Sequence, residues 1–263
     1  MKATVNGIET HYELHGREGA PWLVFSHSLA CSSRMWEPQV AEFGDRYRVL
    51  VYDLRGHGAS AAPAGPYSME QLADDLKGLL DALGIRRTHF VGLSIGGAIG
   101  QTFALRHPGI FAGLVLADTN SAQSPQTLAQ WEERIRIAES KGLQPLVEPT
   151  LERWFTEPFR KSRPEVVKEI GALIASTPVA GYVGCGRAIV GMNLTARLKE
   201  IKAPVLAIAG ESDVALPGTR LIHEKIPGSK LVVLREAAHI SNLEQPEAFN
   251  RALAEFLSSL PSA

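Results

Sequence analysis

Short runs of Val, Ile and Leu recur along the chain, and longer stretches of helical character separate them. Because each run is apolar at nearly every position, it predicts a strand covered on both faces, as in a parallel sheet. Between the runs, Met69 to Leu83 places its leucines on one helical stripe, and Gly84 stands where a C-terminal cap is expected. The clearest runs are Leu23 to Ser26, Val49 to Asp53, His89 to Gly92, Leu114 to Asp118, Val205 to Gly210 and Leu231 to Leu234.

The order of the predicted elements indicates one α/β sheet domain with an insertion. Residues Thr4 to Leu14 predict a hairpin with Asn6-Gly7 as its turn, which adds an antiparallel edge to the sheet. The long segment between Asp118 and Val205 has no comparable strand, and it contains amphipathic stretches broken by prolines. We therefore expect a core domain of residues 1–119 and 196–263, and a helical cap of residues 120–195 inserted in it.

Composition narrows the function classes. With 45% hydrophobic and 21% charged residues, a formal net charge of -1 and dispersed Lys and Arg, the chain lacks the basic footprint of a protein that binds nucleic acid or an anionic membrane. The first residues do not resemble a secretion signal, and no apolar run approaches the ~20 residues that cross a bilayer. Cys31 and Cys185 belong to no metal-ligand motif. These features predict a cytoplasmic protein without a metal.

The segment Gly92-Leu93-Ser94-Ile95-Gly96 matches the G-x-S-x-G pattern and lies between a predicted strand and a predicted helix. In this setting the pattern is typical of a nucleophile elbow, a sharp turn that presents its serine above a sheet. Glycines are needed because the strained turn leaves no room for side chains. The N-terminal end of the following helix favours negative charge on the reacting oxygen. Ser94 is therefore the candidate nucleophile.

A serine hydroxyl needs a base within hydrogen-bond reach, and in this kind of fold an acid and then a histidine follow the serine along the chain. Asp213 follows the apolar run that ends at Gly210, and His239 follows the run that ends at Leu234. Both lie at carboxyl ends of predicted strands, the edge where open α/β sheets build their sites. We expect His239 to act as general base and Asp213 to orient it.

Other residues compete for these roles. Asp118 also ends a predicted strand and is an alternative orienting acid. His57 lies in a glycine-rich turn, where it is expected to hold that loop together, and His107 and His223 are expected at the surface or at helix ends.

The expected reaction also needs an oxyanion hole, built from two backbone N–H groups aimed at the developing negative charge. One donor is expected from Ile95, the residue after the nucleophile. The other is expected from the loop after the first strand of the core, where the N–H of Leu29 is the candidate.

Further segments add to this pattern: Asp53 to Ser60, Gly65 to Ser68, Arg153 to Thr156, Gly181-Tyr182 and His239 to Pro246. Together with the elbow they make the chain resemble, over nearly its whole length, the bacterial 3-oxoadipate enol-lactonases. The elbow and the Arg-Gly-His-Gly loop are shared by many α/β-hydrolases, whereas the cap and His-Ile-Ser-Asn segments are more selective. The resemblance implies an α/β-hydrolase fold, with a mostly parallel eight-stranded sheet, helices on both faces and an inserted helical cap.

The resemblance also implies a reaction, the hydrolytic opening of an enol-lactone ring. Ser94 would attack the lactone carbonyl, His239 would accept its proton, and water activated by His239 would then release the acid from an acyl-enzyme. This chemistry requires no cofactor. The expected partner is a small-molecule ester or lactone, and the expected assembly is a monomer or a small homo-oligomer.

Two places depart from the family pattern. The family usually has Asn-Ser-Leu-Gly where this chain has His27-Ser28-Leu29-Ala30. In the cap, it usually has an Arg-Asp pair and a later Asp where this chain has Val190, Gly191 and Asn193.

A substrate carboxylate needs a cation in the pocket, and the family's usual arginine is absent here. Arg187, Arg153 and Arg134 are the candidate replacements, and Trp154 is a further candidate substrate-binding residue. Two alternatives stay open: a carboxylesterase-like hydrolase of a neutral ester or other carbonyl substrate, and a ligand receptor with slow turnover.

Overall fold

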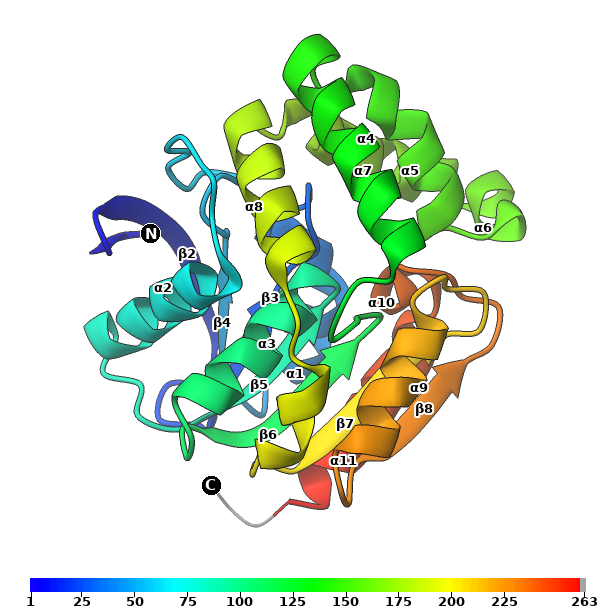
Figure 1. The fold of residues 1–263 in the computed structure, drawn as a ribbon. Coiled ribbons are helices and arrows are strands. Elements are labelled where there is room, and N and C mark those ends of the chain that lie inside the picture. Colours follow the sequence, from blue (N-terminus) through cyan, green and yellow to red (C-terminus); the bar gives the residue numbers. More distant parts are fainter. Residues whose placement is uncertain (261–263) are drawn as a thin grey trace.

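The computed structural model describes residues 1–260. A single twisted sheet runs through the molecule, with strands in the order β1-β2-β4-β3-β5-β6-β7-β8 (Figure 1). The first two pairings, β1 with β2 and β2 with β4, are antiparallel, and all the other pairings in this sheet are parallel. The strands are β1 (Lys2–Val5), β2 (Ile8–Gly16), β3 (Trp22–Ser26), β4 (Arg48–Tyr52), β5 (Thr88–Leu93), β6 (Phe111–Ala117), β7 (Val205–Gly210) and β8 (Lys230–Leu234).

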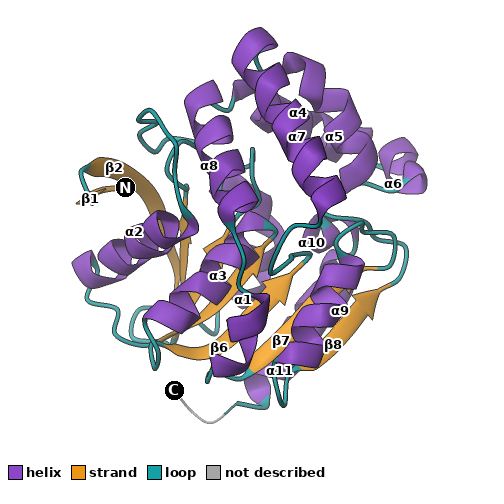
Figure 2. Cartoon of the chain, in the orientation of Figure 1, coloured by secondary structure: helices purple, strands orange, loops and turns teal. Residues whose placement is uncertain are grey.

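The central strands are apolar because both of their faces are covered. Every residue of β5, β6 and β7 is buried. Helices α2 (Met69–Ala82), α3 (Ile95–Arg106) and α9 (Leu216–Lys225) cover one face, and α1 (Glu37–Phe43) and α11 (Pro246–Ser258) cover the other (Figures 1 and 2). The predicted fold class, including the antiparallel edge and the Asn6-Gly7 turn, is confirmed.

The helix predicted from Met69 onward shows how local sequence defines an element. Ser68 caps it by accepting a hydrogen bond from the Gln71 N–H at 3.1 Å, and its leucines are buried against the sheet. The helix ends at Ala82, and Gly84 follows with φ 70°, a conformation that costs little for a residue without Cβ.

Five helices lie between β6 and β7 and form a layer above the carboxyl edge of the sheet (Figure 2). They occupy the segment for which the sequence predicts a cap. The two ends of the insert lie side by side: Leu194 N–H donates to Ser121 O at 2.7 Å, and Ala122 pairs with Asn193. The helices are α4 (Pro125–Lys141), α5 (Val147–Trp154), α6 (Glu157–Ser162), α7 (Pro164–Ser176) and α8 (Val179–Gly191).

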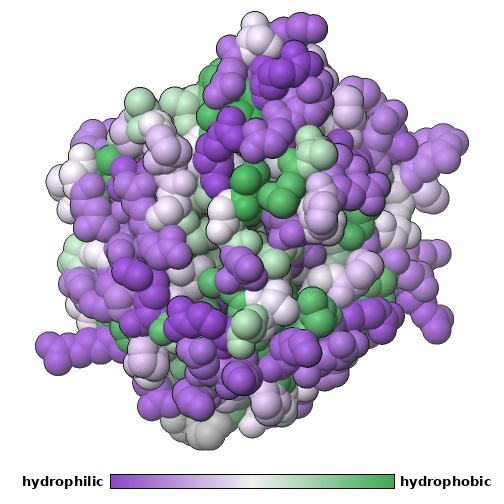
Figure 3. Space-filling view, in the orientation of Figure 1, coloured by the Kyte–Doolittle hydropathy of each residue, from purple (hydrophilic) through white to green (hydrophobic). Residues whose placement is uncertain are grey.

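Helix α8 contacts the core backbone to backbone. A Cβ at Gly181 would lie 1.9 Å from the carbonyl oxygen of Gly56, so no larger residue fits there without movement of the chain. On the outer surface seen in Figure 3 most residues are hydrophilic, and one small hydrophobic patch lies between α8 and α7. Within residues 1–260 no single helix is long and apolar enough to span a membrane; α7 and α8 pass that test only as a pair, bent by 94°.

Four short elements complete the described chain. Three of them are 3-10 helices, at Ser33–Trp36, Gln144–Leu146 and Thr195–Glu200. A fourth short element, helix α10 (Ser241–Glu244), follows the loop after β8.

Candidate active site

Ser94 lies in a strained turn between β5 and α3. Its backbone has φ 57° and ψ -116°, a combination that side chains rarely adopt and that the surrounding structure must enforce. A Cβ at Gly96 would lie 2.3 Å from Ser26 O, so the turn can approach β3 this closely only with glycine. The Ser94 N–H donates to Ala117 O at 2.9 Å, and Thr119 Oγ1 donates to Ser94 O at 2.7 Å. These contacts hold the predicted nucleophile at the carboxyl edge of the sheet.

Asp213 and His239 come together from two neighbouring strands. His239 Nδ1 lies 3.0 Å from Asp213 Oδ1, which also accepts a hydrogen bond from the Ala215 N–H at 3.0 Å. Burial alone would raise the pKa of Asp213, but the charge and hydrogen bond of His239 outweigh it, so the pKa lies below its ordinary value. Asp213 is therefore the ionised partner that a base of this kind requires.

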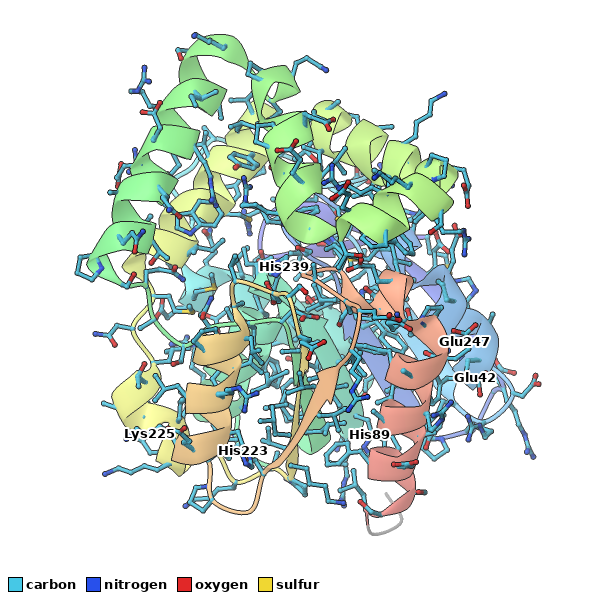
Figure 4. All side chains as sticks on the ribbon, turned by 90° about the vertical axis from the view of Figure 1, so that its right-hand side faces the viewer. Glu42, His89, His223, Lys225, His239 and Glu247 are labelled. Atoms are coloured by element: carbon cyan, nitrogen blue, oxygen red, sulfur yellow. The ribbon has the colours of Figure 1, made fainter. Side chains whose placement is uncertain are left out.

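The pairing through Nδ1 leaves Nε2 of His239 available to the nucleophile. Figure 4 shows His239 at the top of the core, directly beneath the cap helices. Within the described chain no hydrogen bond joins Ser94 Oγ to His239; in free enzymes such contacts are often loose and tighten when substrate binds. The Trp154 ring, from the end of α5, lies against His239 with 5.9 Å between ring centroids.

The two expected oxyanion donors both have free N–H groups. Among residues 1–260, neither Leu29 nor Ile95 uses its N–H in a hydrogen bond, whereas the Ser28 N–H between β3 and Leu29 points to Met35 Sδ at 3.3 Å. An oxyanion hole requires N–H groups that are not already used in hydrogen bonds, and both expected donors meet this condition.

His27 braces the loop that follows β3 and carries Leu29, a role that the sequence did not reveal. Its Nε2 accepts a hydrogen bond from the Leu54 N–H at 2.9 Å, so Nδ1 carries the proton and donates to Ser28 O at 2.7 Å. Burial lowers the pKa of His27, which favours the same neutral form. At the position of the family's usual Asn, this chain thus has a neutral His27 that joins Ser28 O to the Leu54 N–H.

Among residues 1–260 the competing residues form their hydrogen bonds with groups other than His239. Asp118 is fully buried and accepts hydrogen bonds from the Gly210 N–H at 2.8 Å and from Ser241 Oγ. His57 is buried beside His27, His107 lies 3.3 Å from Asp74 Oδ1, and His223 lies 2.9 Å from Ser229 Oγ. Within residues 1–260 no group of three or more His, Cys, Asp or Glu side chains could hold a metal ion.

The three candidate arginines of the cap differ sharply. Arg187 Nη1 is bound to both carboxylate oxygens of Glu132, at 2.6 and 2.8 Å, and its side chain is 36% exposed. Arg153 donates to Pro149 O at 2.7 Å and to Thr150 Oγ1 at 3.1 Å, while Arg134 lies over the Trp131 ring at 5.1 Å.

Neither Arg153 nor Arg134 forms an ion pair with a carboxylate of the described residues. Burial lowers the pKa of Arg153 to about 10, and the charge of nearby Arg134 adds to that effect. Burial likewise lowers the pKa of Arg134, and the two arginines share Tyr182 as a neighbour. Two half-buried cations without a carboxylate partner form a site that favours an anion.

Glu244 is a functional candidate that sequence reasoning missed. One of its oxygens accepts hydrogen bonds from Thr156 N–H and Oγ1, both at 2.8 Å, and the other accepts from the Ala238 N–H. The carboxylate therefore ties the cap to the loop that carries His239. Its only signal in the sequence is its place in the selective segment after His239.

Comparisons with known proteins agree with this geometry. A family model described as the α/β hydrolase fold matches residues 21–246. The chain is 38% identical to 3-oxoadipate enol-lactonase 2 of Acinetobacter baylyi, over 95% of this chain and 93% of the relative. It is 33% identical to a putative carbamate hydrolase RutD of Stutzerimonas stutzeri, over 94% and 96% of the two chains.

Among solved structures, the enol-lactonase from Burkholderia xenovorans LB400 is similar to this chain, with a TM-score of 0.95 and 39% identity. The match covers 98% of this chain and 100% of that one. The resemblance noted in the sequence is thus confirmed. The chain belongs to the α/β-hydrolase family, in the branch that includes the 3-oxoadipate enol-lactonases, and it is a hydrolase that acts on ester bonds.

Proposed function

We propose that the protein opens 3-oxoadipate enol-lactone to 3-oxoadipate through an acyl-enzyme on Ser94. The observation that carries the substrate is the pair Arg153 and Arg134, two half-buried cations in the cap that lack a carboxylate partner among the described residues. The named enol-lactonase relatives support the same substrate class.

The chemistry follows from the proposed triad. Ser94 Oγ attacks the lactone carbonyl while His239 Nε2 accepts its proton, and Asp213 stabilises the imidazolium that forms. The N–H groups of Leu29 and Ile95 stabilise the oxyanion of the tetrahedral intermediate. When the ring C–O bond breaks, the acyl group stays on Ser94 and the enol oxygen takes the proton from His239; the enol then becomes a ketone. Water activated by His239 attacks the acyl-enzyme and releases the acid.

The free carboxylate of this lactone is the feature that distinguishes it from a neutral ester. Burying such a carboxylate without a partner costs several kcal/mol, so the pocket must supply cations or N–H donors. Arg153 is adjacent in sequence to Trp154, whose ring lies against His239, and this supports Arg153 as a partner for the substrate carboxylate. Arg187 is the weakest of the three candidates because Glu132 already neutralises it.

The test compares kcat/KM for 3-oxoadipate enol-lactone with that for p-nitrophenyl acetate, a neutral aryl ester. We expect Arg153→Ala and Arg134→Ala each to raise KM for the lactone by about tenfold or more, which corresponds to ~1.4 kcal/mol, and to change the neutral ester little. Arg187→Ala is the matched control, since it removes a cap arginine that is already paired, and it should change neither substrate.

A carboxylesterase or carbamate hydrolase acting on a neutral substrate is the second candidate. Relatives named as putative carbamate hydrolases favour it, as does the apolar Val190 in place of the family's usual arginine. If the wild type prefers the neutral ester by about tenfold or more in kcat/KM, the lactonase proposal fails and this one replaces it.

A further inference from the structure

The two carboxylate oxygens of Asp213 have unequal surroundings. Oδ1 meets His239 Nδ1 and the Ala215 N–H, both at 3.0 Å. Oδ2 is buried, and no N–H or hydroxyl group of residues 1–260 donates to it. A buried anionic oxygen without a donor is costly, so the group that faces Oδ2 must be identified.

The group placed to face Oδ2 is the carboxyl of Asp118. The end of β6 lies beside the end of β7, and both acids are held at Gly210: the Gly210 N–H donates to Asp118 Oδ1 at 2.8 Å, and the Asp213 N–H donates to Gly210 O at 3.1 Å. The two carboxyls therefore meet at this edge of the sheet. Asp118 is fixed from several sides: its own N–H donates to Ile208 O at 2.8 Å, and its carboxyl meets the Gly210 N–H and Ser241 Oγ. With φ 49°, its backbone ends the strand and turns the side chain from the sheet ladder.

Two carboxyl groups in contact and out of water cannot both be ionised, because like charges at this distance repel strongly. One proton therefore belongs to the pair. Asp213 has the histidine as a partner, which favours its ionised form, whereas Asp118 meets only neutral donors. Burial raises the pKa of Asp118, and the charge of Asp213 raises it further.

We propose that Asp118 is a neutral carboxylic acid whose O–H donates to Asp213 Oδ2, and that it acts as a positioning residue for the proposed triad. This inference rests on the Ser94, His239 and Asp213 assignment above. The hydrogen bond stabilises the charge of Asp213 and fixes the rotation of its carboxylate, so that Oδ1 remains directed at His239.

Asparagine has the shape of a protonated aspartic acid and can supply the same hydrogen bond through Nδ2. Asp118→Asn should therefore keep kcat/KM within about threefold of wild type. Asp118→Ala leaves Oδ2 without a donor, and kcat should fall by roughly tenfold to a hundredfold. If Asp118 served only to fill the core, leucine and asparagine would both replace it. Because the proposed role needs a hydrogen-bond donor, Asp118→Leu, which fills the volume without one, should lose as much activity as Asp118→Ala.

The pH profile distinguishes a neutral Asp118 from an ionised one. Besides Asp213 and His239, the titratable group facing this pair is Glu244, which lies near Asp213 and is retained in all variants. If Asp118 is neutral, Asp118→Asn changes no charge, and the acidic limb of kcat/KM stays in place. A shift of that limb to lower pH by one unit or more would show that a negative charge has been removed beside His239, and would overturn the proposal.

Infrared difference spectroscopy gives a direct readout on the folded protein. The C=O stretching band of a protonated carboxyl should be present in wild type at pH 7 and missing in Asp118→Asn. Equal spectra would overturn the assignment of the proton to Asp118. Ser94→Ala separates this proposal from the one on which it rests. If Ser94→Ala retains activity, the triad is refuted. If Ser94→Ala loses activity but Asp118→Leu is fully active, only the role of Asp118 is refuted.

Discussion

The buried histidine His57 predicts how the protein loses stability in acid. Its Nδ1 lies 3.1 Å from Arg55 O, its Nε2 has no partner among the described residues, and its ring is 5.3 Å from that of His27. Burial, together with the neighbouring His27, lowers the pKa of His57 from 6.5 to about 3, against the opposing effects of the hydrogen bond to Arg55 O and of the charge of Asp53. The folded protein therefore holds this ring neutral where the unfolded chain protonates it.

The sign follows from which state binds more protons. Below pH 6.5 the unfolded chain binds the proton that the folded protein refuses, so stability falls as the pH falls, until the folded pKa near 3 is reached. Each pH unit below 6.5 lowers the free energy of unfolding by about 1.36 kcal/mol. At pH 4.5, about two units below, it is therefore ~2.7 kcal/mol lower than at pH 7.5. Asp53, whose pKa is lowered, contributes its own loss only below its ordinary value of 3.8.

The assay is urea unfolding of wild type and His57→Gln at pH 7.5, 6.5, 5.5 and 4.5. Glutamine is neutral and can still donate to Arg55 O, so the variant lacks only the titration. The carboxyls titrate alike in both proteins; among them are Asp118 and Glu244, whose raised pKa values stabilise the fold as the pH falls. Their contribution therefore cancels in the difference between the two free energies of unfolding. The gap should move in favour of the variant by ~2 to 3 kcal/mol between pH 7.5 and 4.5. A gap independent of pH would refute the reasoning.

Three further predictions concern the site. Ser94→Ala should lower turnover by ~10⁶-fold with an unchanged unfolding midpoint, because the hydroxyl supports no core contact; turnover above a tenth of wild type contradicts this. Asp213→Ala should cost ~10⁴-fold in kcat on an activated ester, well beyond the loss from Asp118→Ala, and the reverse order would make Asp118 the orienting acid. Gly181→Ala forces the cap backbone away from Gly56 and should destabilise the protein by ~1 to 3 kcal/mol while raising KM. An unchanged thermal unfolding temperature would show that the two backbones can move apart at no cost in stability.

The sequence predicted what depends on local pattern. Continuous apolar runs indicate buried parallel strands, and the Gly92 to Gly96 segment indicates the elbow at Ser94. Both could be predicted because they depend only on residues that are close together in the sequence. The strand before Asp118 ends one residue earlier than the apolar run indicates, at Ala117, because Asp118 adopts a positive φ.

Features that depend on side chains meeting across elements could not be predicted in this way. The pairing of Arg187 with Glu132 joins α8 to α4, and the sequence presented Arg187 as a candidate beside Arg153 without showing that Arg187 was already neutralised. The contact of Asp118 with Asp213 crosses two strands, so the sequence presented the two acids as alternatives for one role. Their spatial arrangement is the basis of the proposal that both serve the same histidine.

The paired ends of the cap insert have a consequence for how such a protein can diverge. Because Ser121 and Leu194 are joined by a backbone hydrogen bond, the chain leaves and re-enters the sheet domain at one narrow junction, and the insert is connected as a closed loop. The entropy of closing a flexible loop grows only with the logarithm of its length, by about 0.6 kcal/mol for each doubling. An exchange of residues 123–192 for the cap of a relative therefore leaves β6 and β7 with the same connection. Substrate choice can change through this one segment, provided that the new cap keeps a partner for Glu244, which ties the present cap to the loop that carries His239.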